Sequence, residues 1–161
     1  SIIQLDTFDF SKPFFDALYK ATNYPSDEAV SNNEVQKIHT TTQSDQFDLP
    51  IASFIFAMSD GNYTDICIDH TQGMHVLSKR ISIKDLQLQI SSDPRFFRCH
   101  KSYLINFDAI DSYTGNSHGL KITLHKLPDK IIPVSRKQVV AFKTLYQEYL
   151  LQKKQITLAQ H

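Results

Sequence analysis

The chain has 161 residues, of which 41% are hydrophobic and 21% charged. This composition fits one globular domain with an appendage and excludes a disordered chain. The formal net charge is zero, which argues weakly against a nucleic-acid partner. The charge is unevenly distributed, because residues 1–44 contain three basic and six acidic residues (−3), whereas residues 45–161 contain fourteen basic and eleven acidic residues (+3).

Neither a membrane segment nor a secretory signal is recognisable in the sequence. The most apolar stretch, residues 49–58, is interrupted by Pro50 and Ser53 and has the length of a strand. The first ten residues lack the basic start of a signal peptide. The two cysteines, Cys67 and Cys99, provide neither a disulfide framework nor a zinc-binding spacing. We therefore expect a cytoplasmic protein that does not contact a membrane.

The first elements in chain order are a short helix and a polar linker. Residues 12–22 have bulky side chains at helical spacing, which predicts an amphipathic helix. Residues 23–33 are polar and contain one proline, as is typical of a linker or loop. The apolar stripe of the helix consists of Phe14, Phe15, Leu18 and Tyr19. Such a stripe requires a cover, which another domain or a second copy of the chain can provide.

From about residue 35 the pattern changes to that of β-strands. Glycine and asparagine accept positive φ angles, so Asp60-Gly61-Asn62 and Gln72-Gly73 predict hairpin turns. Alternating or β-branched runs predict strands over residues 35–42, 50–58, 63–69, 74–79, 110–113, 120–124 and 130–134. The fold class is therefore mostly β.

Two further helices are predicted within this β-rich part. Ser82 can cap a short helix in which Leu86 and Ile90 face the core. The Asp85 side chain can in turn accept a hydrogen bond from the backbone N–H of Ser82, as in a capping box. The last helix covers residues 136–152 and is amphipathic. Its core-facing stripe consists of Val139, Phe142, Tyr146 and Tyr149.

A catalytic function has little support in the sequence. The seven histidines are scattered, and there is no His-Glu-x-x-His motif, no paired-cysteine site and no Gly-x-Ser-x-Gly elbow. Four glycines are too few for a Gly-rich phosphate loop. His70 and His75 can approach each other across a turn, but a solvated hairpin explains them better than a metal site. We therefore predict a protein that is not an enzyme and that needs no metal or cofactor.

Residues 95–106 are the segment most informative about function, because they are dense in aromatic and basic side chains. We expect Arg95, Arg98, His100 and Lys101 to form one basic cluster on a rigid platform, which suits a polyanion. A charged loop beside a buried strand is the simpler alternative, and composition alone favours it.

A second basic point is Ser135-Arg136-Lys137, at the start of the last helix. Backbone N–H groups at a helix N-terminus can bind a phosphate. The simpler alternative is that Ser135 caps the helix, and both can hold at once.

The run RFFRCHKSYLIN, residues 95–106, resembles the F-x-R-x-H-x-S-x-x-V-N signature of LytTR domains. These domains occur in accessory-gene, competence and bacteriocin regulators of Gram-positive bacteria. Residues 55–63 are similar to the second strand and loop of the family, residues 83–90 to its short helix, and IPVSR at 132–136 to its I-P-V-S-R ending. The resemblance covers residues 37–150. It departs at Ala57-Met58, where many members have an acidic residue, and near Pro128.

The resemblance implies an elongated fold of antiparallel strands with short helices. Such domains insert loops into successive DNA grooves and bend the duplex. Three segments are implied to contact DNA: Ser59, Asn62 and Tyr63 in the first, Arg98, Lys101 and Ser102 in the second, and Ser135, Arg136 and Lys137 in the third.

Physical chemistry suggests a role for each of these contacts. Arg136 is the best base reader, because its guanidinium can make two bonds to a guanine edge. Asn62 can pair with adenine, and Tyr63 can meet a phosphate or a thymine methyl group. Arg98 and Ser102 suit phosphates, and Lys101 suits either a base or a phosphate. We expect His100 to be structural and partly buried.

We predict three parts in the chain: an N-terminal helical segment with its linker (1–33), a LytTR-like DNA-binding domain (34–154) and a C-terminal tail (155–161). Residues 8–23 resemble the end of a response-regulator receiver domain, in which a Lys-Pro pair, here Lys12-Pro13, precedes the last helix. A dimerisation or membrane-proximal helix is the alternative.

The predicted function is sequence-specific binding of double-stranded DNA, as the output domain of a bacterial two-component transcription regulator. The expected partners are promoter DNA with paired direct repeats and a second copy of the chain, held through the N-terminal helix. The alternative is a protein-interaction or ligand-sensing module on the same β scaffold. DNA binding requires Asn62, Lys101 and Arg136 along one face, spread over about one helical turn of roughly 34 Å. An interaction module exposes an apolar patch instead.

Overall fold

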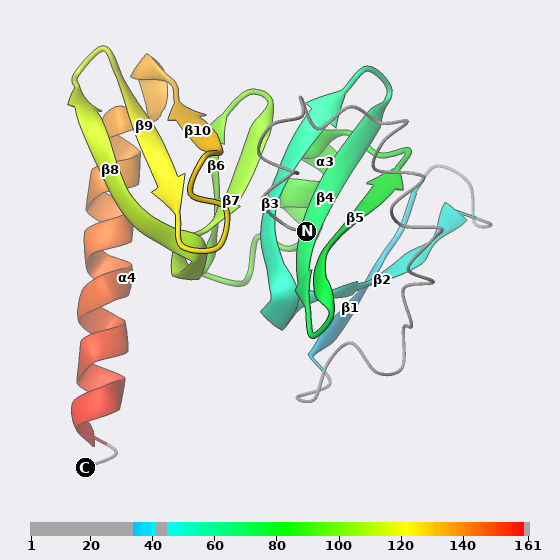
Figure 1. Ribbon diagram of the computed structural model, residues 1–161, viewed down its shortest axis with the longest axis horizontal. Coiled ribbons are helices and arrows are strands. Elements are labelled where there is room, and N and C mark those ends of the chain that lie inside the picture. Colours follow the sequence, from blue (N-terminus) through cyan, green and yellow to red (C-terminus); the bar gives the residue numbers. More distant parts are fainter. Residues whose placement is uncertain (1–33, 41–44, 160–161) are drawn as a thin grey trace.

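The computed structural model describes residues 34–40 and 45–159 of the chain. The helix expected over residues 12–22 and the linker expected over residues 23–33 lie outside the described residues. Within them, the chain forms three antiparallel sheets and a long helix after the last strand (Figure 1). The expected mostly antiparallel β fold is confirmed.

The largest sheet contains the strands β3 (Phe54–Asp60), β4 (Tyr63–His70), β5 (Gly73–Lys79), β6 (Phe96–His100) and β7 (Tyr103–Asn106). Their order is β5-β4-β3-β7-β6, so β3 is the central strand. It pairs with β4 through a two-residue turn and with β7, which follows much later in the chain. β3 is therefore hydrogen-bonded to a neighbouring strand along each of its two edges.

The second sheet contains β8 (Ile110–Asn116), β9 (Gly119–Leu124) and β10 (Ile131–Val134), in the order β10-β9-β8. The long helix α4 (Val139–Ala159) runs along β8 in Figure 1. The ring of Tyr113 on β8 packs edge-on against Phe142 of the helix, with 5.2 Å between ring centroids. This contact fixes α4 against the second sheet.

A third, small sheet pairs β1 (Val35–Ile38) with β2 (Phe47–Pro50), and the short helix α3 (Ile83–Gln89) follows β5. The hydroxyl of Ser82 accepts a hydrogen bond from the Asp85 amide at 3.0 Å, which confirms the predicted N-cap. Leu86 and Ile90 are fully buried, also as predicted.

The five-stranded sheet is buried on both of its faces. On one face, Ile66 and Ile68 of β4 pack in a core cluster with side chains of α3, β1 and β2. On the other face, Cys67 packs in a second cluster with side chains of β8, β9, β10 and α4. Each fully buried Ile or Leu contributes about 1.5–3 kcal/mol to stability. The sheet is thus a rigid platform for the turns at its ends.

The strand predicted over residues 50–58 is wrong in its first part. Pro50 ends β2, and Ile51–Ser53 form a single 3-10 turn before β3 begins at Phe54. Proline cannot donate to a strand ladder, and the turn redirects the chain between two sheets. Likewise, the strand predicted over residues 35–42 ends at Ile38.

The last helix begins with the 3-10 turn η4 (Arg136–Gln138), and α4 continues to Ala159, past the end expected at residue 152. The predicted stripe faces the core. Val139 and Phe142 are buried, and Tyr146 and Tyr149 pack against the same cluster.

Candidate nucleic-acid interface

The three segments expected to contact DNA lie at the same edge of the molecule, the upper edge in Figure 1. The first is the tip of the β3–β4 hairpin, the second is the tip of the β6–β7 hairpin, and the third is the junction between β10 and the last helix. All three are turns at strand ends, so the sheets beneath them determine their positions.

The β3–β4 hairpin turns tightly at Gly61 and Asn62, between the paired residues Asp60 and Tyr63. Gly61 has a φ of +62°, a conformation that residues with a Cβ rarely adopt. Asn62 at the tip is exposed, whereas Tyr63 and Ser59 are half-buried. The turn therefore presents the Asn62 amide group outward, and the predicted hairpin is confirmed.

Two hydrogen bonds between side chains and the backbone stabilise the β6–β7 turn. Nη2 of Arg98 donates to the carbonyl oxygen of Lys101 at 2.9 Å, and the Ser102 amide donates to Nδ1 of His100 at 3.0 Å. Burial lowers the pKa of His100, and the charges of Lys101 and Arg98 lower it further, so the ring is neutral at pH 7 and Nδ1 can accept. The turn leaves Lys101 exposed at its tip.

A backbone hydrogen bond connects the first two segments. The Ser59 amide donates to the carbonyl oxygen of Ser102 at 2.9 Å, just beyond the last paired residues of the β3–β7 ladder, Met58 and Tyr103. The two hairpin tips are therefore neighbours at the end of one sheet.

A second backbone bond brings in the third segment. The Ser135 amide donates to the carbonyl oxygen of Cys99 at 2.9 Å, which joins the end of β10 to β6. The Ser135 side chain makes no capping bond to the turn that follows, so the expected capping by its hydroxyl is absent. Arg136 and Lys137 begin that turn and are both exposed.

Arg95 does not belong to the basic cluster in which we expected it. It precedes β6 at the end of the strand away from Lys101, and its Nη2 lies 2.6 Å from Oδ2 of Asp93. The same nitrogen lies 3.5 Å from Glu34. Sequence proximity was misleading here because a five-residue strand separates its two ends by about 16 Å.

Lys130 is a basic residue near this edge that the sequence reasoning did not assign. Its Nζ lies 5.5 Å from the ring centroid of Tyr103 and 3.9 Å from Sδ of Met58. These two residues are neighbours of Ser102 and Ser59. No motif marks Lys130, because it belongs to the connection between β9 and β10 and reaches the edge only through folding.

Lys101, Arg136 and Lys137, the exposed basic groups at this edge, form no ion pair with any residue that the structure describes. The ion pairs of lysines within the described residues lie elsewhere and involve Lys37, Lys126 and Lys153. Lys101, Arg136 and Lys137 are exposed to solvent, which suits contact with a polyanion.

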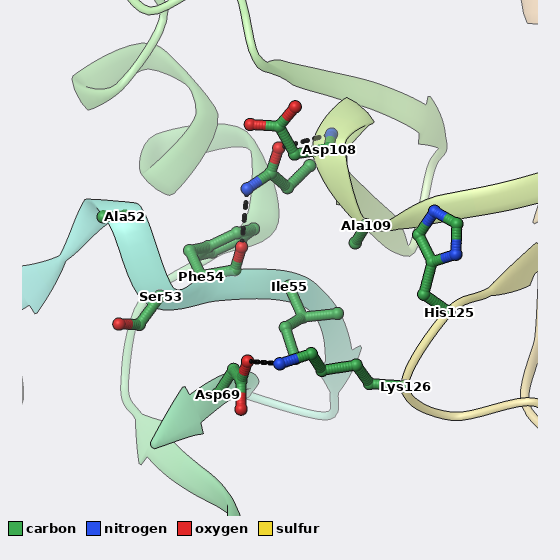
Figure 2. Close-up of a pocket in the computed structure, with 10 residues that line it drawn as sticks. Ala52, Ser53, Phe54, Ile55, Asp69, Asp108, Ala109, His125 and Lys126 are labelled. Carbon is green, nitrogen blue, oxygen red and sulfur yellow. Dashed lines mark hydrogen bonds and ion pairs between the residues drawn. The ribbon is translucent and has the colours of Figure 1, made fainter. Parts of the chain in front are cut away.

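A pocket lies at the opposite ends of the same strands (Figure 2). Its charged side chains are paired within the chain, since Nζ of Lys126 lies 2.5 Å from Asp69 and Asp108 accepts a bond from Lys153 at 2.7 Å. The lining residues come from the turn before β3 and the start of β3, the ends of β4 and β7, the turn after β7, and the loop after β9. With its cations neutralised, this pocket does not suit a polyanion.

In the part of the chain that the structure describes, no group of three or more His, Cys, Asp or Glu side chains is arranged to hold a metal ion. None of the described helices is long and apolar enough to cross a membrane.

Comparisons with known proteins agree with one another. A family model described as the LytTr DNA-binding domain matches residues 44–147, a range that includes all three edge segments. The sensory transduction protein LytT of Oceanobacillus iheyensis is 33% identical over 82 residues, which are 50% of this chain and 32% of that protein. The chain thus spans about a third of the length of this relative.

A solved LytTr DNA-binding domain of a Bacillus cereus response regulator has a similar fold. It superimposes with a TM-score of 0.51 at 16% sequence identity, over 69% of this chain and 94% of that one. At this identity the likeness concerns the fold alone.

Proposed function

The chain belongs to the LytTr family of DNA-binding domains, and from this premise we propose that it reads specific DNA sequences with three turns at one edge. Each turn enters or follows a groove of the duplex, and together they cover successive grooves. The duplex bends toward the edge so that all three turns engage. The chain acts in this way as the output domain of a two-component transcription regulator.

The single observation that carries the proposal is the pair of backbone hydrogen bonds that join the three turns. Ser59 bonds to Ser102, and Ser135 bonds to Cys99, each at 2.9 Å. These bonds make one continuous edge from segments that are far apart in sequence. A rigid edge whose exposed cations form no ion pair within the described part of the chain loses little conformational entropy on binding, which favours affinity for a polyanion.

We assign base contacts to the exposed side chains at the tips. The Arg136 guanidinium reads a guanine through two bonds, and the Asn62 amide reads an adenine. Lys101 lies between them along the edge and binds a base or a phosphate.

The remaining side chains bind the backbone of the duplex and fix the register. Ser102, Ser135 and Lys137 donate to phosphates, as do Ser59 and Tyr63. Arg98 has a double role, because its Nη2 already holds the Lys101 carbonyl and its Nε is buried, which leaves Nη1 for a phosphate. We count Arg98 as a positioning residue as well as a phosphate contact.

We extend the proposal to the organisation of the chain and to its partners. Residues 34–154 form the DNA-binding unit, residues 1–33 connect it to a regulatory part, and residues 155–161 are its tail. Two copies occupy paired direct repeats in a promoter and are held together through the helix predicted over residues 12–22.

The test is a selection of bound duplexes from a random double-stranded library with the full chain. We expect a recurring sequence, and we expect Lys101→Ala to reduce affinity for it at least several-fold. The matched control is Lys154→Ala, which removes an exposed lysine near the distant end of α4 and should leave affinity unchanged. Recovery of random sequences, or equal losses in both variants, would contradict the proposal and favour the interaction-module alternative.

A further inference from the structure

A fourth turn reaches the same edge of the molecule, and the interface described above does not include it. The β8–β9 hairpin turns at Ser117 and His118, between the paired residues Asn116 and Gly119. Its tip points to the upper edge in Figure 1, beside the end of β10. Every residue from Asp111 to His118 is exposed.

We propose that this tip, residues 116–118, is a fourth DNA-contacting segment that binds the phosphates flanking the groove read by Arg136. The inference rests on the proposed function and extends the interface beyond its third turn. It assigns to His118 a position within reach of the DNA backbone.

The position of the tip follows from the pairing of β9 with β10. Leu120 pairs with Val134, so Gly119 comes next to Ser135, one residue before Arg136. A Cβ placed on Gly119 would lie 3.3 Å from the Val134 carbonyl oxygen, so the two backbones are in direct contact. Neighbouring strands are about 4.8 Å apart, less than half the roughly 12 Å width of a major groove. A group on the tip therefore faces the groove wall when Arg136 lies in the groove.

The chemistry of the hairpin suits a phosphate. The sequence has no acidic residue between Asp111 and Asp129, a stretch that contains His118, His125, Lys121 and Lys126. Asparagine, serine and histidine at the tip all have side-chain groups that can donate hydrogen bonds. An uncharged or cationic tip without acidic neighbours does not repel the duplex.

The tip is also held in one shape. The Asn116 side-chain oxygen accepts a bond from the His118 amide at 2.9 Å. Gly115 has a φ of +130°, and a Cβ there would lie 2.3 Å from the carbonyl oxygen of Gly119. The hairpin is therefore preorganised, and little ordering is required when it meets a phosphate.

The experiment places charge at the tip and compares it with the far end of the same strand. His118→Lys and His118→Glu are the test variants, and His125→Lys and His125→Glu are the matched controls. His125 is also exposed but follows the opposite end of β9, where its Nδ1 lies 3.4 Å from Oδ1 of Asp111. Each full-length variant is titrated with the duplex selected from the random library, at several salt concentrations. Circular dichroism checks that the variants are folded.

We expect His118→Lys to bind more tightly and to steepen the log–log salt slope by about 0.9, the value for one additional phosphate contact. Its advantage over the parent chain should shrink roughly threefold between about 50 and 200 mM salt. His118→Glu should bind several-fold more weakly. Both His125 variants should match the parent chain.

Three results would overturn the inference. If the His118 variants match the parent chain while Lys101→Ala weakens binding, the tip does not touch DNA and the proposed function stands. If the His125 variants shift binding as much as the His118 variants, the effect is one of total charge. If the parent chain selects no duplex, the proposed function fails together with this extension.

Discussion

The hydroxyl of Tyr149 lies 2.6 Å from Oδ1 of Asp108, and Nζ of Lys153 lies 2.7 Å from the same oxygen. Asp108 belongs to η3 (Phe107–Ala109), the short turn between the five-stranded sheet and β8. The two bonds therefore hold the second half of α4 against the junction of the two larger sheets. The first turn of the same helix follows Arg136, so this contact also supports the orientation of the third DNA segment.

We predict that Tyr149→Phe lowers the free energy of unfolding by about 1 kcal/mol at pH 7. A hydrogen bond to a carboxylate contributes roughly 1.5–3 kcal/mol when buried, and partial exposure of this site reduces that figure. The ring remains in place, so packing is retained. Urea unfolding followed by circular dichroism measures the change. An unaltered midpoint would show that the bond contributes nothing.

The same contact predicts a dependence on pH. Burial alone would raise the pKa of Asp108, but bonds from Lys153 and Tyr149 outweigh it and hold the pKa below its usual range. A carboxylate with a depressed pKa stabilises the fold above its unfolded pKa of about 3.9, and this stabilisation is lost as the pH falls through the folded value. The difference between the parent chain and Tyr149→Phe should therefore be constant above about pH 5 and shrink below about pH 4. Unfolding curves at several pH values test this, and a gap that widens on acidification would contradict it.

Arg136→Ala should weaken specific binding by about 1–3 kcal/mol and relax the preference at one base position. A guanidinium that reads a guanine edge contributes to discrimination as well as affinity. Lys137→Ala, at the adjacent exposed position, should weaken binding to all sequences about equally. Selection repeated with each variant separates the two outcomes. If Arg136→Ala loses affinity with an unchanged base preference, Arg136 is only a phosphate contact.

Binding should depend strongly on salt. Contacts with about five phosphates give a log–log slope of about −4 to −5. The net charge of zero should keep binding to unrelated DNA weak, so specificity should be visible even at low salt. Fluorescence anisotropy at increasing potassium chloride measures the slope. A slope near zero on the selected duplex is incompatible with an interface built on phosphates.

Removal of residues 1–33 should leave a folded domain that binds its DNA site. The first described residue, Glu34, is already held in the domain, because its carbonyl oxygen accepts a bond from the Ile51 amide at 3.0 Å and its carboxylate lies 3.5 Å from Arg95. Sedimentation and DNA titration of the shortened chain test this. Loss of folding would assign the segment to the core. A folded chain that no longer binds would show that pairing of two copies through residues 12–22 is required.

Local chemistry accounts for the parts of the fold that could be predicted from the sequence. The Gly61-Asn62 turn and the Ser82 cap depend on one or two residues each, and both were recognisable. The apolar stripe of α4 was also recognisable, because Phe142 and its neighbours repeat at helical spacing. The separation of β2 from β3 was not, because Phe47–Met58 is apolar almost throughout and its break depends on which sheet each half joins.

The candidate site also has features that the sequence predicts and features that depend on the folded structure. The basic and polar side chains of the three turns could be selected from a motif, but their convergence depends on pairings between distant segments. No local sequence pattern predicts that the Ser135 amide donates a hydrogen bond to the carbonyl oxygen of Cys99, or that Lys130 lies over the ring of Tyr103. The same limitation led to the error with Arg95, whose partner Asp93 lies at the far end of the strand from the cluster.

The backbone bonds that join the turns have a consequence for how such a protein can change. Because Ser59, Ser102 and Ser135 are placed by main-chain atoms, the distance between reading points does not depend on the side chains that do the reading. The backbone of the edge thus fixes the spacing between the contacted bases, while the exposed side chains determine which bases are preferred. Substitutions at positions 62, 101 and 136 can therefore alter the preferred base at each position separately. In contrast, one base pair inserted in the DNA between two of the contacted bases shifts the second base out of register, and no single side-chain substitution can compensate for that shift.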